Sequence, residues 1–171
     1  LQALLPAADS AFAVVSKIEL ENPTVLIPTL LEAIKNRVPS ATSVSYSPGC
    51  DINSTDESGF AVALQAARDA DAVILVMGGK SGLVPDCTTG EFRDASNLGL
   101  PGVQEKLALA VLATGKPCAL VLINGRPAAI PDLVEKTHAI LQAWVPGEEG
   151  ARAIAAVLFG DVNPGGKLPI S

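Results

Sequence analysis

Glu91 lies in the stretch of the chain whose residue types best suit catalysis. Residues 85–94 read PDCTTGEFRD, so a carboxylate is surrounded by small, hydroxyl-bearing, aromatic and basic side chains. Cleavage of a glycosidic bond uses two carboxyl groups, one as nucleophile or base and one as proton donor. A flexible loop that supplies the acid would make chemical sense, so Glu91 and its neighbours are the candidates for chemistry in this chain.

Two neighbours of Glu91 could assist it. Thr89 and Arg93 could orient the Glu91 carboxylate or bind a sugar. For Arg93 there is an open alternative, which is a salt bridge with Asp86 or Asp94.

The elements that must position this stretch alternate between extended and helical patterns. Short apolar runs predict strands, and periodic apolar faces between Pro and Gly boundaries predict helices. This alternation indicates a single α/β domain over residues 1–171, a layered sandwich with a mostly parallel sheet of five to six strands and helices on both faces. The expected strands are residues 11–15, 42–46, 72–77, 118–123 and 139–145, and the expected helices are residues 28–38, 59–70, 101–115, 131–135 and 148–159.

Two connections are longer than is usual in such a sheet, residues 47–58 and 78–100. Both follow predicted strands, and the carboxyl ends of parallel strands are where open sheets place ligands. We therefore expect Cys50, Cys87 and Glu91 on one rim. In an oxidising compartment Cys50 and Cys87 could form a disulfide that holds the Glu91 loop.

Several function classes find no support. The net charge of −6 disfavours nucleic acid, and no apolar run is long enough to span a membrane. The three cysteines lack a zinc-type spacing, and a phosphate-binding loop would need glycine where Ile74 stands. His138 precedes a predicted strand, at the edge opposite the long loops, so a Ser-His-Asp site is not indicated. No motif implies a metal or cofactor.

Five blocks of the sequence resemble successive blocks of the second domain of glycoside hydrolase family 3. The resemblance covers roughly residues 28–171, and because the chain opens without Met it reads as part of a longer protein. The blocks are YSPGCD with DESGF (residues 46–51 and 56–60), GEFRD with LPGVQ (90–94 and 100–104), NGRP (124–127), AWVPGEEG (143–150) and VLFGDVNPGGKLP (157–169).

The resemblance implies a role for one residue. In that family an N-terminal (β/α)8 barrel carries an aspartate nucleophile, and the second domain lends the acid/base glutamate, which the spacing to LPG matches to Glu91. The chain is then a domain of a retaining enzyme that removes β-linked glucose or xylose from non-reducing ends. It would be inactive without the missing barrel, and a fibronectin-like domain could follow it. The family also suggests secretion or the periplasm. The alternative is a non-catalytic carbohydrate-binding or domain-docking module.

Overall fold

The computed structural model describes residues 27–170, which form two compact units. The sheet unit is continuous from Val44 to Val145. The helix unit joins the described residues before position 44 to those after position 145. The strand expected at residues 11–15 lies outside the described residues.

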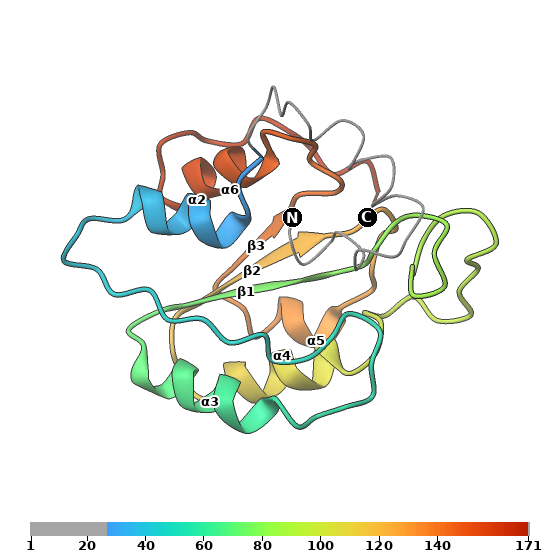
Figure 1. The fold of residues 1–171 in the computed structure, drawn as a ribbon, viewed down its shortest axis with the longest axis horizontal. Helices are drawn as coiled ribbons and strands as arrows, with labels where there is room; N and C mark the ends of the chain where they lie inside the picture. Colours follow the sequence, from blue (N-terminus) through green and yellow to red (C-terminus); the bar gives the residue numbers. More distant parts are fainter. Residues whose placement is uncertain (1–26, 171) are drawn as a thin grey trace, which may run out of the picture. The chain divides into compact units, whose positions relative to one another are not determined.

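The sheet unit contains a parallel sheet of three strands in the order β1-β2-β3 (Figure 1). β1 spans Val73–Gly78, β2 spans Cys118–Ile123 and β3 spans Ala139–Gln142. β1 and β2 pair in register along all six residues of each strand. These strands are nearly continuous apolar runs, which is typical of parallel strands covered by helices. The predicted α/β class and parallel pairing are confirmed.

Two of the strand predictions are wrong, and the described sheet has three strands instead of five to six. Residues 42–46 form no strand. Tyr46 keeps 63% of its surface exposed, so this segment lacks the burial on both faces that an inner strand requires. The predicted continuation of β3 to Val145 fails because Trp144 has a backbone φ of 55°. A residue in the left-handed region cannot continue an extended strand.

Three helices of the sheet unit pack on one face of its sheet (Figure 1). Side chains alternate between the faces of a strand, so Met77 of β1 and Leu120 of β2 point into the core that these helices cover. Leu107 and Leu133 enter the same core from the helices and are 5% and 0% exposed. That helices also cover the other face stays a prediction. The three helices are α3 (Phe60–Asp69), α4 (Gln104–Leu112) and α5 (Pro131–Val134).

In the helix unit, α2 (Leu30–Arg37) packs against α6 (Gly150–Leu158). α2 begins with a capping box, in which Thr29 and Glu32 each accept a hydrogen bond from the other's main-chain N–H. All five predicted helices are therefore present, with ends shifted by a few residues. None of the helices within residues 27–170 has the length and hydrophobicity needed to cross a bilayer.

Candidate functional site

The Glu91 loop, residues 79–103, begins at the carboxyl end of β1 and leads into α4. The buried amide of Gln104 holds the start of this loop, because it accepts from the N–H of Gly78 and donates to the carbonyl of Gly78, both at 2.8 Å. The same amide donates to the carbonyl of Ile52 at 2.8 Å. The two long loops therefore meet at one edge of the sheet, as predicted, although only the Glu91 loop follows a strand.

The first half of the Glu91 loop folds back on itself through main-chain hydrogen bonds. The N–H of Thr89 donates to the carbonyl of Lys80 at 3.1 Å, and the N–H of Gly82 donates to the carbonyl of Thr89 at 3.0 Å. Gly90 has a φ of 124°, and a β-carbon there would lie 2.5 Å from the carbonyl oxygen of Gly82. Only glycine fits at this position, so the residue before Glu91 is packed against the opposite limb of the loop.

Glu91 is exposed on the surface of the sheet unit. Its carboxylate has no hydrogen-bond or ion-pair partner among residues 27–170. The next residue, Phe92, is 90% exposed and has a φ of 58°. A left-handed backbone costs a residue with a β-carbon about 1–2 kcal/mol, so surrounding contacts must maintain it. The carboxylate can therefore act on a molecule outside this unit.

The guanidinium of Arg93 binds the loop's own main chain. It donates to the carbonyl oxygens of Leu83 and Val84 at 3.2 and 3.1 Å. The alternative of a salt bridge with Asp86 or Asp94 is not what the structure has, because no ion pair of Arg93 occurs within residues 27–170. Arg93 thus links the second half of the loop to the first.

Two further contacts pair polar groups within the loop, whereas the buried Nε of Arg93 has no hydrogen-bond partner among the described residues. The ammonium of Lys80 binds the carboxylate of Asp86, and this hydrogen bond lowers the pKa of Asp86. The hydroxyl of Thr89 is buried and lies 3.5 Å from the carbonyl oxygen of Lys80. Its best-placed partner is therefore a group of the loop itself.

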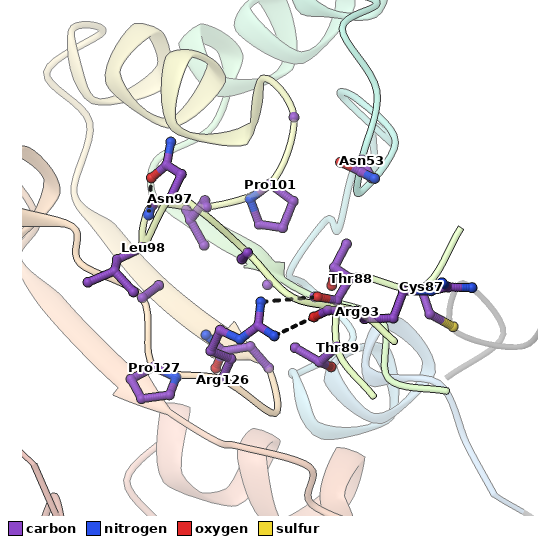
Figure 2. A pocket seen from close by; sticks show the side chains of 18 of the residues that line it. Asn53, Cys87, Thr88, Thr89, Arg93, Asn97, Leu98, Pro101, Arg126 and Pro127 are labelled. Carbon is purple, nitrogen blue, oxygen red and sulfur yellow. Dashed lines mark hydrogen bonds between the residues drawn. The ribbon is translucent and has the colours of Figure 1, made fainter. Parts of the chain in front are cut away.

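Arg126 binds the main chain on both sides of Glu91 (Figure 2). One terminal nitrogen of its guanidinium donates to the carbonyl oxygen of Arg93 at 2.6 Å, and the other lies 3.4 Å from the carbonyl oxygen of Thr88. Arg126 follows β2, so the contact joins the loop to the neighbouring strand. Sequence reasoning did not identify Arg126 as a site residue, and its place in the NGRP block, residues 124–127, was the available signal.

A cavity of about 410 Å³ lies at the carboxyl edge of β1 and β2, beside the Glu91 loop. This volume is within the range of about 300–1,000 Å³ found for small-molecule sites. Glu91 does not line the cavity, whereas both predicted neighbours of Glu91 do. Figure 2 shows polar side chains that line it, and these include Asn53, Thr88, Thr89, Arg93, Asn97 and Arg126.

The cysteines that the sequence brings to this rim are free thiols, and the disulfide between Cys50 and Cys87 is not formed. Cys50 packs against the hydrophobic core of the sheet unit, and burial raises the pKa of its thiol. Cys87 is 4% exposed and its sulfur lies against Gly82 within the Glu91 loop. Each sulfur is therefore packed among different neighbours.

Other titratable groups lie away from the loop or do not cluster. The Nδ1 of His138 accepts from the N–H of Cys118 at 3.3 Å, at the amino end of β2 and hence at the opposite edge, as predicted. Within residues 27–170 no three His, Cys, Asp or Glu side chains converge as a metal site would require. Glu91 remains the candidate for proton transfer at the carboxyl edge.

A profile of the glycosyl hydrolase family 3 C-terminal domain matches residues 8–171. The chain belongs to this family. A beta-xylosidase of Formosa agariphila is 43% identical over 143 residues, and the match covers 84% of the chain and 19% of that protein. A periplasmic beta-glucosidase of Salmonella typhimurium is 37% identical over 165 residues, which cover 84% of the chain and 21% of that protein.

Solved structures of a beta-glucosidase and of a beta-xylosidase share the fold. A beta-glucosidase from Erythrobacter marinus superposes with a TM-score of 0.68 at 34% identity, over 81% of the chain and 22% of that protein. A family 3 exo-beta-xylosidase bound to a xylobiose aziridine probe gives the same TM-score at 29% identity, over 81% of the chain and 17% of that protein. The family 3 chain spans about a fifth of the length of the curated relatives it matches, and the resemblance drawn from its sequence blocks is confirmed.

Proposed function

We propose that this chain acts as one domain that delivers Glu91, as the acid/base residue, to a sugar bound in a barrel domain of the same enzyme. The reaction is hydrolysis of β-glucosides or β-xylosides from their non-reducing ends with retention of configuration. The exposed carboxylate of Glu91, without a partner among the described residues, carries this proposal, since it lies on a folded loop and is open to solvent.

The chemistry needs Glu91 in both protonation states. In the first step the protonated carboxyl of Glu91 gives its proton to the glycosidic oxygen, while an aspartate of the barrel attacks the anomeric carbon and the bond to the leaving group breaks. In the second step the Glu91 carboxylate takes a proton from water, and this water displaces the aspartate and restores it. The two carboxyl groups of a retaining pair lie about 5–5.5 Å apart, so the chain alone is expected to be inactive.

Thr89 and Arg93 enter this proposal mainly as residues that shape the loop. Both line the cavity beside the loop, where a hydroxyl of the sugar or of the leaving group could reach the Arg93 guanidinium. Sugar preference is then set chiefly by the barrel. The periplasmic beta-glucosidase among the relatives supports a secreted or periplasmic enzyme.

The test is a Glu91→Gln substitution in the barrel-containing enzyme. Glutamine keeps the size of the side chain but cannot exchange a proton, so turnover of aryl β-glycosides should fall by about 10²–10⁴-fold. Azide should restore the rate and give a β-glycosyl azide, because this anion can attack the glycosyl-enzyme without a general base to deprotonate it. The matched control is Glu135→Gln, at an exposed glutamate just after α5. Unchanged turnover in E91Q would contradict the proposal.

The cavity supports a second candidate, a non-catalytic carbohydrate-binding or docking module. Its polar lining does not include Glu91, so it could hold a sugar independently of catalysis. Calorimetric titration of the chain with glucose and with xylose distinguishes the binding module from the catalytic domain. Saturable binding without a barrel favours the module, whereas no binding together with association to a separately expressed barrel favours the catalytic domain.

A further inference from the structure

We propose that Arg126 is a positioning residue for Glu91, which fixes the segment between Thr88 and Arg93 by hydrogen bonds to the main chain at both of its ends. The inference rests on the proposed acid/base role of Glu91. It adds Arg126, from the connection after β2, whose guanidinium stays protonated and therefore acts on Glu91 only through the loop.

The geometry of the contact is suited to fixing a short segment. The two acceptor carbonyls belong to residues three positions before and two positions after Glu91. A guanidinium is planar and carries its N–H groups in a rigid fork, so binding both carbonyls at once fixes the distance between them. The stronger bond, at 2.6 Å, is to Arg93, and the longer contact of 3.4 Å is to Thr88.

Hydrogen bonds of neighbouring residues fix the backbone that carries Arg126. Two residues before it, Asn124 is 5% exposed, and its side-chain oxygen accepts a hydrogen bond from Gln142 at 2.6 Å. The carbonyl of Ile123, at the end of β2, accepts from the N–H of Gly79 at 3.0 Å. Arg126 therefore extends from the central strand of the sheet, and its position is set by the sheet.

The part of this segment before Glu91 is also held by main-chain bonds of Thr88 and Thr89 to Lys80, and Glu91 and Phe92 lie between these bonds and the bond from Arg126 to the carbonyl of Arg93. The segment contains no helix and no strand of the named sheet, and Phe92 stands in a left-handed conformation. Such a conformation persists where the surroundings impose it, and Arg126 binds the carbonyl of the very next residue, Arg93. Without this bond Phe92 can relax toward an allowed conformation, and the adjoining Glu91 must then move with the backbone.

The guanidinium has no carboxylate partner within residues 27–170, and main-chain carbonyls occupy its two terminal nitrogens. Two of its five N–H donors are used in this way, and its effect on a sugar is then indirect, through the loop. The proposal therefore predicts a change in the rate of bond cleavage with little change in KM, whereas a sugar-binding arginine would mainly raise KM.

The experiment is a double-mutant cycle in the barrel-containing enzyme, with E91Q, R126A and the double variant. We expect R126A to lower kcat/KM by about 10- to 100-fold for a phenyl glycoside, because a displacement of roughly 1 Å can cost about 10²-fold. For a dinitrophenyl glycoside, whose leaving group needs no proton, the loss should be less than about threefold. In the E91Q background R126A should have little further effect, since the residue through which it acts is already lost.

A matched control is Arg68→Ala, at an exposed arginine of α3, which should leave both substrates unaffected. If R126A does not fold, R126K replaces it: lysine keeps the charge but can reach only one carbonyl at a time, so a smaller loss with the same leaving-group dependence is expected.

The outcomes separate the two proposals. Equal losses for both leaving groups, or the same factor in the wild-type and E91Q backgrounds, would overturn the positioning role. So would an unaffected R126A alongside an impaired E91Q, which would leave the function of Glu91 intact. An E91Q enzyme with unchanged turnover would overturn the proposed function and this inference together.

Discussion

Gly90 directly precedes Glu91, and its replacement by alanine perturbs the loop without touching the carboxylate. The φ of Gly90 is 124°, a region that side chains rarely adopt, and the added β-carbon would lie 2.5 Å from the carbonyl oxygen of Gly82. Backbone strain at such a position costs about 1–3 kcal/mol. Ordinary contacts begin near 3.4 Å, so one limb of the loop must also move by roughly an ångström to relieve the overlap.

The strain should affect activity more than folding. A loop with few buried apolar contacts can open locally, so the loss in the free energy of unfolding is limited to the stability of the loop itself. We expect G90A to lower that free energy by no more than about 1–3 kcal/mol. A displaced catalytic group loses rate steeply, and we expect kcat/KM in the barrel-containing enzyme to fall by about 100-fold.

The assay compares two glycine variants by urea unfolding and by hydrolysis of a phenyl β-glycoside. The control is Gly115→Ala after α4, where φ is 75° and no atom lies within 4 Å of the added β-carbon. This change should cost about 1–2 kcal/mol of stability with unchanged kcat/KM. A G90A enzyme with wild-type kcat/KM would refute the view that the packed limbs of the loop place Glu91.

Two further predictions concern the contacts that build the loop. Gln104→Ala removes the side chain that pairs both main-chain groups of Gly78. It should lower the free energy of unfolding, measured in urea, by about 2–4 kcal/mol, because buried donors and acceptors lose their partners. Gln104→Glu keeps the volume of the side chain but cannot donate, and a loss below about 1 kcal/mol in both variants would contradict this role of Gln104. Lys80 lowers the pKa of Asp86 in the folded chain. Their pairing therefore stabilises the fold at pH values above the ordinary carboxyl pKa, near pH 4, and this stabilisation is lost as the pH falls through the lowered pKa of the folded state. The stability difference between wild type and Asp86→Asn should therefore be present at about pH 6 and shrink as the pH falls below about 4. A difference independent of pH would exclude the ion pair as its cause.

Much of the secondary structure could be predicted because its signals are local. The strands β1 and β2 are short apolar runs, and α2 carries its capping residues Thr29 and Glu32 within its first turn. The predicted strands failed where local pattern was not enough. Residues 42–46 have the composition of a strand but not its burial, and β3 ends early because Trp144 adopts a positive φ that a bulky aromatic rarely takes.

The candidate site divides in the same way. The position of Glu91 in a long connection after a strand, and its spacing to LPG, were readable from the chain, since a carboxylate, a loop length and a motif are properties of neighbouring residues. The sequence did not reveal that the Glu91 carboxylate lacks a partner among the described residues or that Cys50 and Cys87 are free thiols, because exposure and packing depend on residues distant in sequence.

The sequence by itself determined the family, the alternation of strands and helices, and the identity of the candidate acid/base residue. Only the tertiary structure decided what holds that residue in place. Arg126 reaches carbonyls 33 and 38 positions away, and Gln104 joins main-chain groups 26 and 52 positions away. Main-chain carbonyls are alike in every residue, so no side-chain pattern predicts which of them an arginine or glutamine will bind. The way strands and loops come together at one edge of the sheet determines these partners.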